Sequence, residues 1–215
     1  MRVQHVPEVR SFVYEPASEL LRVSSWMHDE VLHTGWELMR NCFFDPGIFH
    51  KAINARVGPA MGYKHLSKVE LAFTNGGWFN YLGVKISNAA PCISVEASES
   101  LGPSFNTLGN LKDLNLRFRG LDDGYGGSPW GCYANHWAGR SSPYVCCQRT
   151  IVDWICTFAY PSLIDKCKEE KVKVTLTGAV KTDTKTKWEE IFAAKRDHDH
   201  DAAIASILDT PWTAL

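Results

Sequence analysis

The sequence predicts an α/β fold, with an α+β arrangement as the alternative, in which helices back a sheet resembling that of the leucine-rich-repeat solenoids. Two segments, 66–73 and 111–118, share one template, in which a leucine is followed three residues later by alternating apolar residues. An alternation with a period of two is typical of a strand that is buried on one face. A third alternating segment lies at 171–178. Because helical stretches separate these segments, we expect them to lie side by side in one sheet.

The chain before these strands is predicted to be mainly helical. Apolar residues recur at every third or fourth position over 18–40, which indicates a long amphipathic helix. Residues 41–44 are expected to form a short strand. A second helix is expected at 48–57, ending at Gly58 and Pro59. Residues 1–45 would then form an N-terminal helical segment, followed by an α/β repeat-like domain at 46–215.

The connecting and C-terminal elements follow from apolar spacing and helix signals. A helix is expected over 150–168, broken at Pro161, because proline lacks the amide hydrogen that an interior helical residue donates. Thr182 or Asp183 could cap a further helix, since both side chains offer an oxygen to free backbone amides. A short amphipathic helix is expected at 202–208.

Composition excludes several classes of function. The 215 residues include 23 basic and 24 acidic side chains, which leaves a net charge of −1 and no field to attract nucleic acid or anionic lipid. No secretory signal is recognised at the N-terminus, and no stretch is apolar enough to cross a bilayer. We therefore expect an intracellular protein, cytoplasmic or nuclear, that binds neither nucleic acid nor membranes.

The cysteines are expected to be reduced. Their number is seven, which is odd, and they are scattered through a chain that is long enough to form a core without disulfides. Four of them have apolar or helical neighbours and are expected to fill the core: Cys42, Cys92, Cys156 and Cys167.

A long loop at 120–147 is rich in glycine, serine, proline and aromatic residues, and a loop of this length is usually functional or disordered. Its aromatic content favours ordered packing, and we expect Trp130, Tyr133 and Trp137 to contribute to a surface that binds a protein. The same loop holds the ligand types that zinc prefers, although the spacing is unlike that of zinc ribbons or fingers. The candidate zinc ligands are Cys132, His136, Cys146 and Cys147.

Three further groups of residues have alternative interpretations. Arg117, Arg119 and Arg149 form either a small basic patch or internal ion pairs with Asp122 and Asp123. The alternating acidic and histidine residues of 196–201 are interpreted as a solvated helix end or linker, with adventitious metal binding as the alternative. Trp26 and Trp36 lie on nearly one helical face, which is either buried or available to a partner. No phosphate-binding loop or nucleophile elbow is recognised, and no cofactor is expected.

Residues 6–14 read Val-Pro-Glu-Val-Arg-Ser-Phe-Val-Tyr. This segment resembles Leu-Pro-x-Glu-x-Arg-x-x-Ile-Tyr, the opening of a family of fungal F-box-like proteins that is named for its Glu-x-Arg motif. Residues 20–32 resemble its second block, a helix that begins Leu-Leu-x-Val-Ser. Only residues 15–17 separate the two blocks, where relatives usually carry a longer insertion, so the F-box-like segment would be truncated. Later similarities to uncharacterised members lie at 41–44, 65–71, 111–119, 148–154 and 174–178.

The resemblance implies an intracellular interaction module that binds an adaptor, such as a Skp1-like protein, through its N-terminal helices and a target through its α/β part. The leading hypothesis is therefore a non-catalytic protein–protein recognition module, with the F-box-like substrate adaptor as its specific form. The alternative is an enzyme of unknown class, or a zinc-dependent protein, that uses the 120–147 loop. The residues expected to form or support the adaptor-binding surface are Pro7, Glu8, Arg10, Leu21, Val23, Trp26 and Met27.

Overall fold

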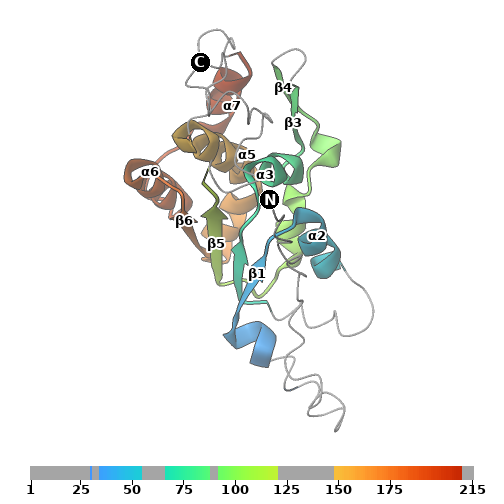
Figure 1. The fold of residues 1–215 in the computed structure, drawn as a ribbon. Helices are drawn as coiled ribbons and strands as arrows, with labels where there is room; N and C mark the ends of the chain where they lie inside the picture. The colour runs from blue at the N-terminus through green and yellow to red at the C-terminus, as the bar shows by residue number, and fades with distance from the viewer. Residues whose placement is uncertain (1–29, 31–33, 55–65, 88–91, 121–147, 210–215) are drawn as a thin grey trace, which may run out of the picture.

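The computed structural model describes residues 30, 34–54, 66–87, 92–120 and 148–209. Its centre is a four-stranded sheet in the order β1-β2-β5-β6, and every neighbouring pair of strands is parallel. The predicted α/β class is confirmed, because helices connect and flank the parallel strands (Figure 1). The strands of this sheet are β1 (Arg40–Phe43), β2 (Lys68–Leu71), β5 (Asp113–Phe118) and β6 (Lys173–Gly178).

The three strands expected to lie side by side are β2, β5 and β6, and this prediction is confirmed. Leu71 is in register with Leu116, which is in register with Leu176. The leading leucines of the shared template, Leu66 and Leu111, are both buried beneath the strand entries. The predicted strand at 41–44 is also present, since β1 pairs with the free side of β2.

The helices share a single hydrophobic core with one face of the sheet. Leu71, Leu116 and Leu176 are fully buried, and the same core includes side chains from α2, α3, the 3-10 helix η4, α5 and α6. Parallel connections are nearly always right-handed, so a strand order equal to the chain order returns each helix to the same face. The helical elements are α2 (Pro46–Asn54), α3 (Asn75–Tyr81), η3 (Ala97–Glu99), η4 (Gly102–Thr107), α5 (Gln148–Glu169), α6 (Thr182–Phe192) and α7 (His200–Asp209).

The outer edge of β6 is closed by two side chains of α6. The Leu176 amide donates a hydrogen bond to Glu189 Oε1 at 2.9 Å, and Lys185 Nζ donates to the Leu176 carbonyl at 2.5 Å. Lys185 and Glu189 also form an ion pair with each other. Since an exposed edge strand can pair with another chain, this arrangement protects that end of the sheet.

Two predicted helix signals are wrong. Helix α5 continues through Pro161 without a break, because buried residues on both sides of it, such as Ile155 and Leu163, belong to one core that holds the helix together. Helix α6 begins after Lys181 with no side-chain cap, and the Asp183 carboxylate instead pairs with Arg149 at 2.7 Å.

Most of the first predicted helix, 18–40, lies outside the described residues, and its described part ends before β1 begins at Arg40. Residues 34–38 are helical, and Trp36 is buried in the core, which agrees with the interpretation of a buried helical face. The expected helix at 202–208 is present as α7. The segment before it is not a simple solvated linker, since the His198 ring lies 4.9 Å from the rings of both Tyr160 and Trp188.

Apart from the short 3-10 helices η3 and η4, two elements were not expected from the sequence. One is helix α3, which begins at Asn75, where the Gly77 amide donates to the Thr74 hydroxyl. The other is an antiparallel hairpin of β3 (Val84–Ser87) and β4 (Cys92–Val95), which lies at the same end of the molecule as α7 (Figure 1). In the part of the chain that the structure describes, no helix combines the length and the apolar character that a bilayer crossing requires.

Candidate functional site

The face of the sheet opposite the helices is polar, and its side chains lie in rows across the four strands. The alternation that buries Val69 and Leu71 turns Lys68 and Glu70 to the other face. The strand register then aligns Arg40, Lys68, Asp113 and Lys173 in an amino row. It aligns Cys42, Glu70, Asn115 and Thr175 in a middle row, followed by Arg117 and Thr177. We call these ten residues the open face.

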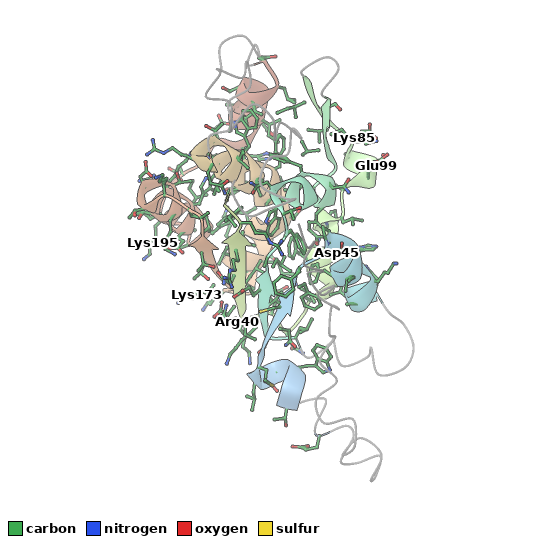
Figure 2. The ribbon with its side chains drawn as sticks, viewed as in Figure 1. Arg40, Asp45, Lys85, Glu99, Lys173 and Lys195 are labelled. Atoms are coloured by element: carbon green, nitrogen blue, oxygen red, sulfur yellow. The ribbon has the colours of Figure 1, made fainter. Side chains whose placement is uncertain are left out.

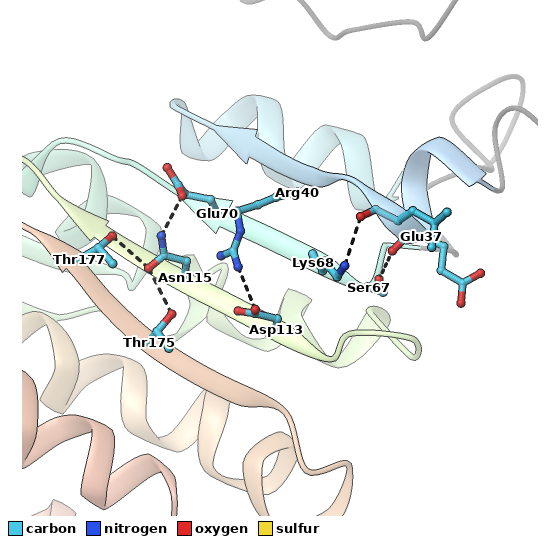
Figure 3. Close-up of polar contacts among 10 residues, drawn as sticks. Glu37, Arg40, Ser67, Lys68, Glu70, Asp113, Asn115, Thr175 and Thr177 are labelled. Atoms are coloured by element: carbon cyan, nitrogen blue, oxygen red, sulfur yellow. Dashed lines mark hydrogen bonds and ion pairs between the residues drawn. The ribbon is translucent and has the colours of Figure 1, made fainter.

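A hydrogen-bonded network centred on Asn115 joins β2, β5 and β6 (Figure 3). Asn115 is only 5% exposed, and its Nδ2 donates to Glu70 Oε2 at 2.8 Å. Its Oδ1 accepts from the hydroxyls of Thr175 at 3.3 Å and Thr177 at 3.0 Å. Arg117 adds an ion pair to Glu70 Oε1 at 3.3 Å. The Glu70 carboxylate is therefore held by two partners from the same strand.

The amino row is tied to the short helical segment that precedes β1. Lys68 Nζ donates to the Leu38 carbonyl at 3.2 Å, and the Ser67 hydroxyl donates to the Glu37 carbonyl (Figure 3). These bonds satisfy carbonyls at a helix end, which otherwise lack intrahelical partners. In the same row, Arg40 pairs with Asp113 at 2.8 Å. The amino row thus fixes the junction between the helix and the sheet.

Cys42 lies on the open face and is exposed, so its expected role as a core filler is wrong. Its position in the strand alternates with buried Phe43, which explains why an apolar sequence context did not place it in the core. Partial burial and the neighbouring Glu70 carboxylate raise the pKa of the Cys42 thiol. A raised pKa lowers the thiolate fraction at neutral pH, which makes this thiol a weak nucleophile. Cys156 is buried, as expected.

The open face carries an excess of positive charge. It holds four cationic side chains and two carboxylates, although the whole chain has a net charge of −1. Arg40 and Arg117 are each paired with a carboxylate. Within the described ranges, Lys173 is exposed and makes no side-chain hydrogen bond or ion pair, and Lys68 bonds only to a carbonyl. Figure 2 shows Arg40 and Lys173 toward the same end of the sheet.

Exposed apolar side chains flank β1. Leu38 is 63% exposed and Met39 is 54% exposed, directly before the strand, and Phe44 is 53% exposed directly after it. The Arg119 guanidinium lies 5.8 Å from the centre of the Phe44 ring, a cation–π contact. In the described part of the chain, only Val95 and Leu208 are other large apolar residues with comparable exposure. Apolar exposure is therefore concentrated beside the open face.

The three arginines considered as a basic patch do not form one. Arg117 pairs with Glu70, Arg149 pairs with Asp183, and Arg119 lies over Phe44. Ion pairing is confirmed for two of them, although their partners differ from Asp122 and Asp123, which lie outside the described residues.

None of the site residues predicted from the sequence falls within the described residues. The expected adaptor-binding set from Pro7 to Met27 lies in 1–29, and the loop residues Trp130, Tyr133 and Trp137 lie in 121–147. The same loop range contains the candidate zinc ligands from Cys132 to Cys147. Within the described ranges, no group of three or more histidine, cysteine or acidic residues is arranged to hold a metal ion.

The open face was missed by the sequence analysis, although a signal for it was present. The polar residues between the apolar positions of the strand templates, such as Glu70 and Asn115, had to point away from the core. The strand register, which brings them together, becomes visible only in the structure.

A scan against protein-family models and searches of curated proteins and of solved structures found no match to this chain. The resemblance to fungal F-box-like proteins therefore stays a prediction.

Proposed function

We propose that this chain is a non-catalytic protein–protein recognition module that binds a protein on the open face of its sheet. The observation that carries the proposal is the one-sided sheet, whose polar, hydrogen-bonded face lies opposite the helical core. Parallel sheets usually bury both faces, so a polar and accessible face is a surface available for contact. Exposed side chains such as Arg117 and Lys173 lie on it.

The chemistry of the open face favours binding over catalysis. Glu70 is held by Arg117 and Asn115, and Asp113 by Arg40, so both carboxylates are already engaged. The raised pKa of Cys42 reduces its nucleophilicity. An aligned set of fixed polar side chains suits the recognition of a surface.

The finer proposal is a short leucine-rich-repeat-like solenoid that serves an intracellular, fungal F-box-like substrate adaptor. Support comes from the strand order, which follows the chain order, and from the leucine-led template shared by β2 and β5. In this proposal the residues from Pro7 to Met27 bind a Skp1-like adaptor, while the open face binds the target. Residues matched by the family resemblance, such as Arg10 and Leu21, would act in the adaptor contact together with Trp26.

A steric block tests the recognition proposal without assuming the partner's charge. Thr177→Trp adds a large side chain to an exposed strand position on the open face, and Ser94→Trp adds one to an exposed position on β4. Each full-length variant would be used to capture proteins from a fungal lysate, after thermal melting confirms that it is folded. We expect a partner that the wild type and Ser94→Trp retain and Thr177→Trp loses. Capture of the same proteins by all three chains would contradict the proposal.

The adaptor contact has a separate test. Trp26→Ala should abolish capture of a Skp1-like adaptor and retain the protein bound on the open face. Retention of the adaptor by this variant would exclude Trp26 from the contact. Elemental analysis addresses the alternative function, because stoichiometric zinc that resists dialysis would favour a zinc-dependent protein that uses the 120–147 loop.

A further inference from the structure

We propose that the amino end of the open face binds an acidic segment of the partner protein that also carries apolar side chains. This inference rests on the proposed function and specifies the chemistry of the partner. Its carboxylates would meet Lys68 and Lys173, and its apolar side chains would meet Leu38 and Met39.

The two lysines are the cations of the amino row whose charge is not neutralised by a described carboxylate. Arg40 and Asp113 pair with each other at 2.8 Å, whereas Lys68 donates to a carbonyl and Lys173 makes no side-chain hydrogen bond or ion pair with another described residue. The carbonyl leaves the charge of Lys68 in place and positions its ammonium group beside Leu38. The carboxylates of a partner would therefore form ion pairs with Lys68 and Lys173.

The apolar part of the surface is continuous with these cations. Leu38 and Met39 directly precede β1, and the Leu38 carbonyl accepts from Lys68 Nζ at 3.2 Å. Their exposed fractions, 63% and 54%, are high for large apolar side chains. Exposed apolar side chains next to charged ones are typical of protein-binding surfaces.

The spacing fits an extended segment that crosses the strands. Lys68 on β2 and Lys173 on β6 flank β5, and strands are about 4.8 Å apart, so the two positions are separated by about 10 Å. That separation matches about three residues of extended chain, at roughly 3.3 Å per residue. A segment that runs from β6 toward β1 would place acidic residues first and apolar residues after them.

A protein fits this surface better than a nucleic acid. The carboxylates of Glu70 and Asp113 lie among the cations, so the open face offers no continuous row of positive charge along which a phosphate backbone could lie. A protein segment can instead place its carboxylates at Lys68 and Lys173 alone. Nucleic-acid binding usually neutralises several phosphates, whereas in the described part of the open face only Lys68 and Lys173 have no carboxylate partner. A phosphate backbone offers no apolar surface against which Leu38 and Met39 could be buried.

The test uses the full-length chain and short fluorescent peptides. The probe peptide combines glutamate and aspartate with leucine and phenylalanine. In one comparison peptide serine replaces the apolar residues, and in another lysine replaces the acidic residues. A single-stranded DNA oligonucleotide serves as the nucleic-acid probe. Fluorescence anisotropy would measure each affinity, at low and at physiological salt.

Two double variants locate the binding. Lys68→Gln with Lys173→Gln removes the open charges, and Lys51→Gln with Lys181→Gln removes the same charge from exposed positions of α2 and the start of α6. We expect the first double variant to lose about tenfold in affinity for the probe peptide, and the second to stay within about twofold. Leu38→Ser with Met39→Ser should also weaken binding. Equal weakening by both lysine double variants would overturn the proposal.

The probes separate the remaining outcomes. Weaker binding of both comparison peptides supports the proposal, and a decrease in affinity at higher salt does so too. If the serine peptide binds as tightly as the probe peptide, the proposed contact with Leu38 and Met39 is overturned. If DNA binds as tightly as the probe peptide or more tightly, the proposal that the partner is a protein is overturned. Absence of binding by all probes, together with a lysate partner that Thr177→Trp loses, overturns only the partner chemistry. If no probe binds and Thr177→Trp also captures the same lysate proteins as the wild type, the proposed function is overturned as well.

Discussion

Replacement of Asn115 is the sharpest test of the network across the open face. In Asn115→Ala the Glu70 carboxylate loses a charge-assisted hydrogen bond of 2.8 Å, and the hydroxyls of Thr175 and Thr177 lose a shared acceptor. A charge-assisted bond contributes about 1.5–3 kcal/mol and a neutral one about 1 kcal/mol. The threonine hydroxyls can recover water, and Glu70 keeps Arg117, so we expect the free energy of unfolding to fall by about 2–3 kcal/mol.

Asn115→Asp isolates the electrostatic part of this effect, because it keeps the shape of the side chain. It replaces the donor that faces Glu70 with a second carboxylate, and like charges at this distance raise the pKa of the pair. The folded state then binds protons more readily than the unfolded state. The variant's stability deficit at neutral pH should therefore shrink as the pH falls.

Urea unfolding followed by tryptophan fluorescence measures both variants, since Trp36, Trp78 and Trp188 are buried in the described core. Thr177→Val is the matched control, because it removes one bond of 3.0 Å and leaves Asn115 its other partners. We expect the control to lose less than about 1 kcal/mol. A loss below about 0.5 kcal/mol for Asn115→Ala would refute a stabilising role for the network.

Three further predictions concern the supporting fold. Gly178→Ala should lower the melting temperature strongly, because Gly178 has a φ of +82° and an added Cβ would lie 2.2 Å from the Phe118 carbonyl oxygen. The control Gly76→Ala should not lower it, because the space around its added Cβ is open. Glu189→Ala should speed hydrogen exchange of the Leu176 amide, and unchanged exchange would show that this bond does not protect the edge of β6. Burial, Lys187 and His200 lower the pKa of His198, so protonation favours the unfolded state and stability should fall as the pH drops through the ordinary histidine range. A thermal melt of His198→Phe at each pH should show a smaller fall than the wild type, and equal falls would exclude His198 as the cause.

The sheet was predictable because the residue pattern within each strand indicates the strand without reference to the rest of the chain. In β2 and β5 a leading leucine and alternating apolar residues specify both a strand and its buried face, and Leu71 and Leu116 do lie in register. Helix α3 was not predictable in this way. Gly76 and Gly77 disfavour a helix, and the burial of its aromatic side chains, including Trp78, outweighs that local preference.

The candidate site was less accessible to sequence reasoning than the fold. Glu70 and Asn115 are 45 residues apart, and no local pattern specifies that they share a hydrogen bond. Alternation indicates that both side chains leave the core, but only the register makes them neighbours. The search for chemistry in the sequence favoured aromatic, cysteine and histidine residues in 120–147, whereas the described surface uses ordinary polar residues of the strands.

The arrangement of the open face separates stability from recognition. A parallel sheet with one polar face forgoes a second apolar layer, so its polar side chains must be satisfied across the strands. The middle row meets this need through the buried Asn115, which donates to Glu70 and accepts from Thr175 and Thr177. In the amino row, Lys68 and Lys173 have no carboxylate partner among the residues that the structure describes. Substitutions in the middle row should therefore lower the free energy of unfolding, while substitution of Lys173, whose side chain is exposed, should weaken partner binding and leave folding nearly unchanged.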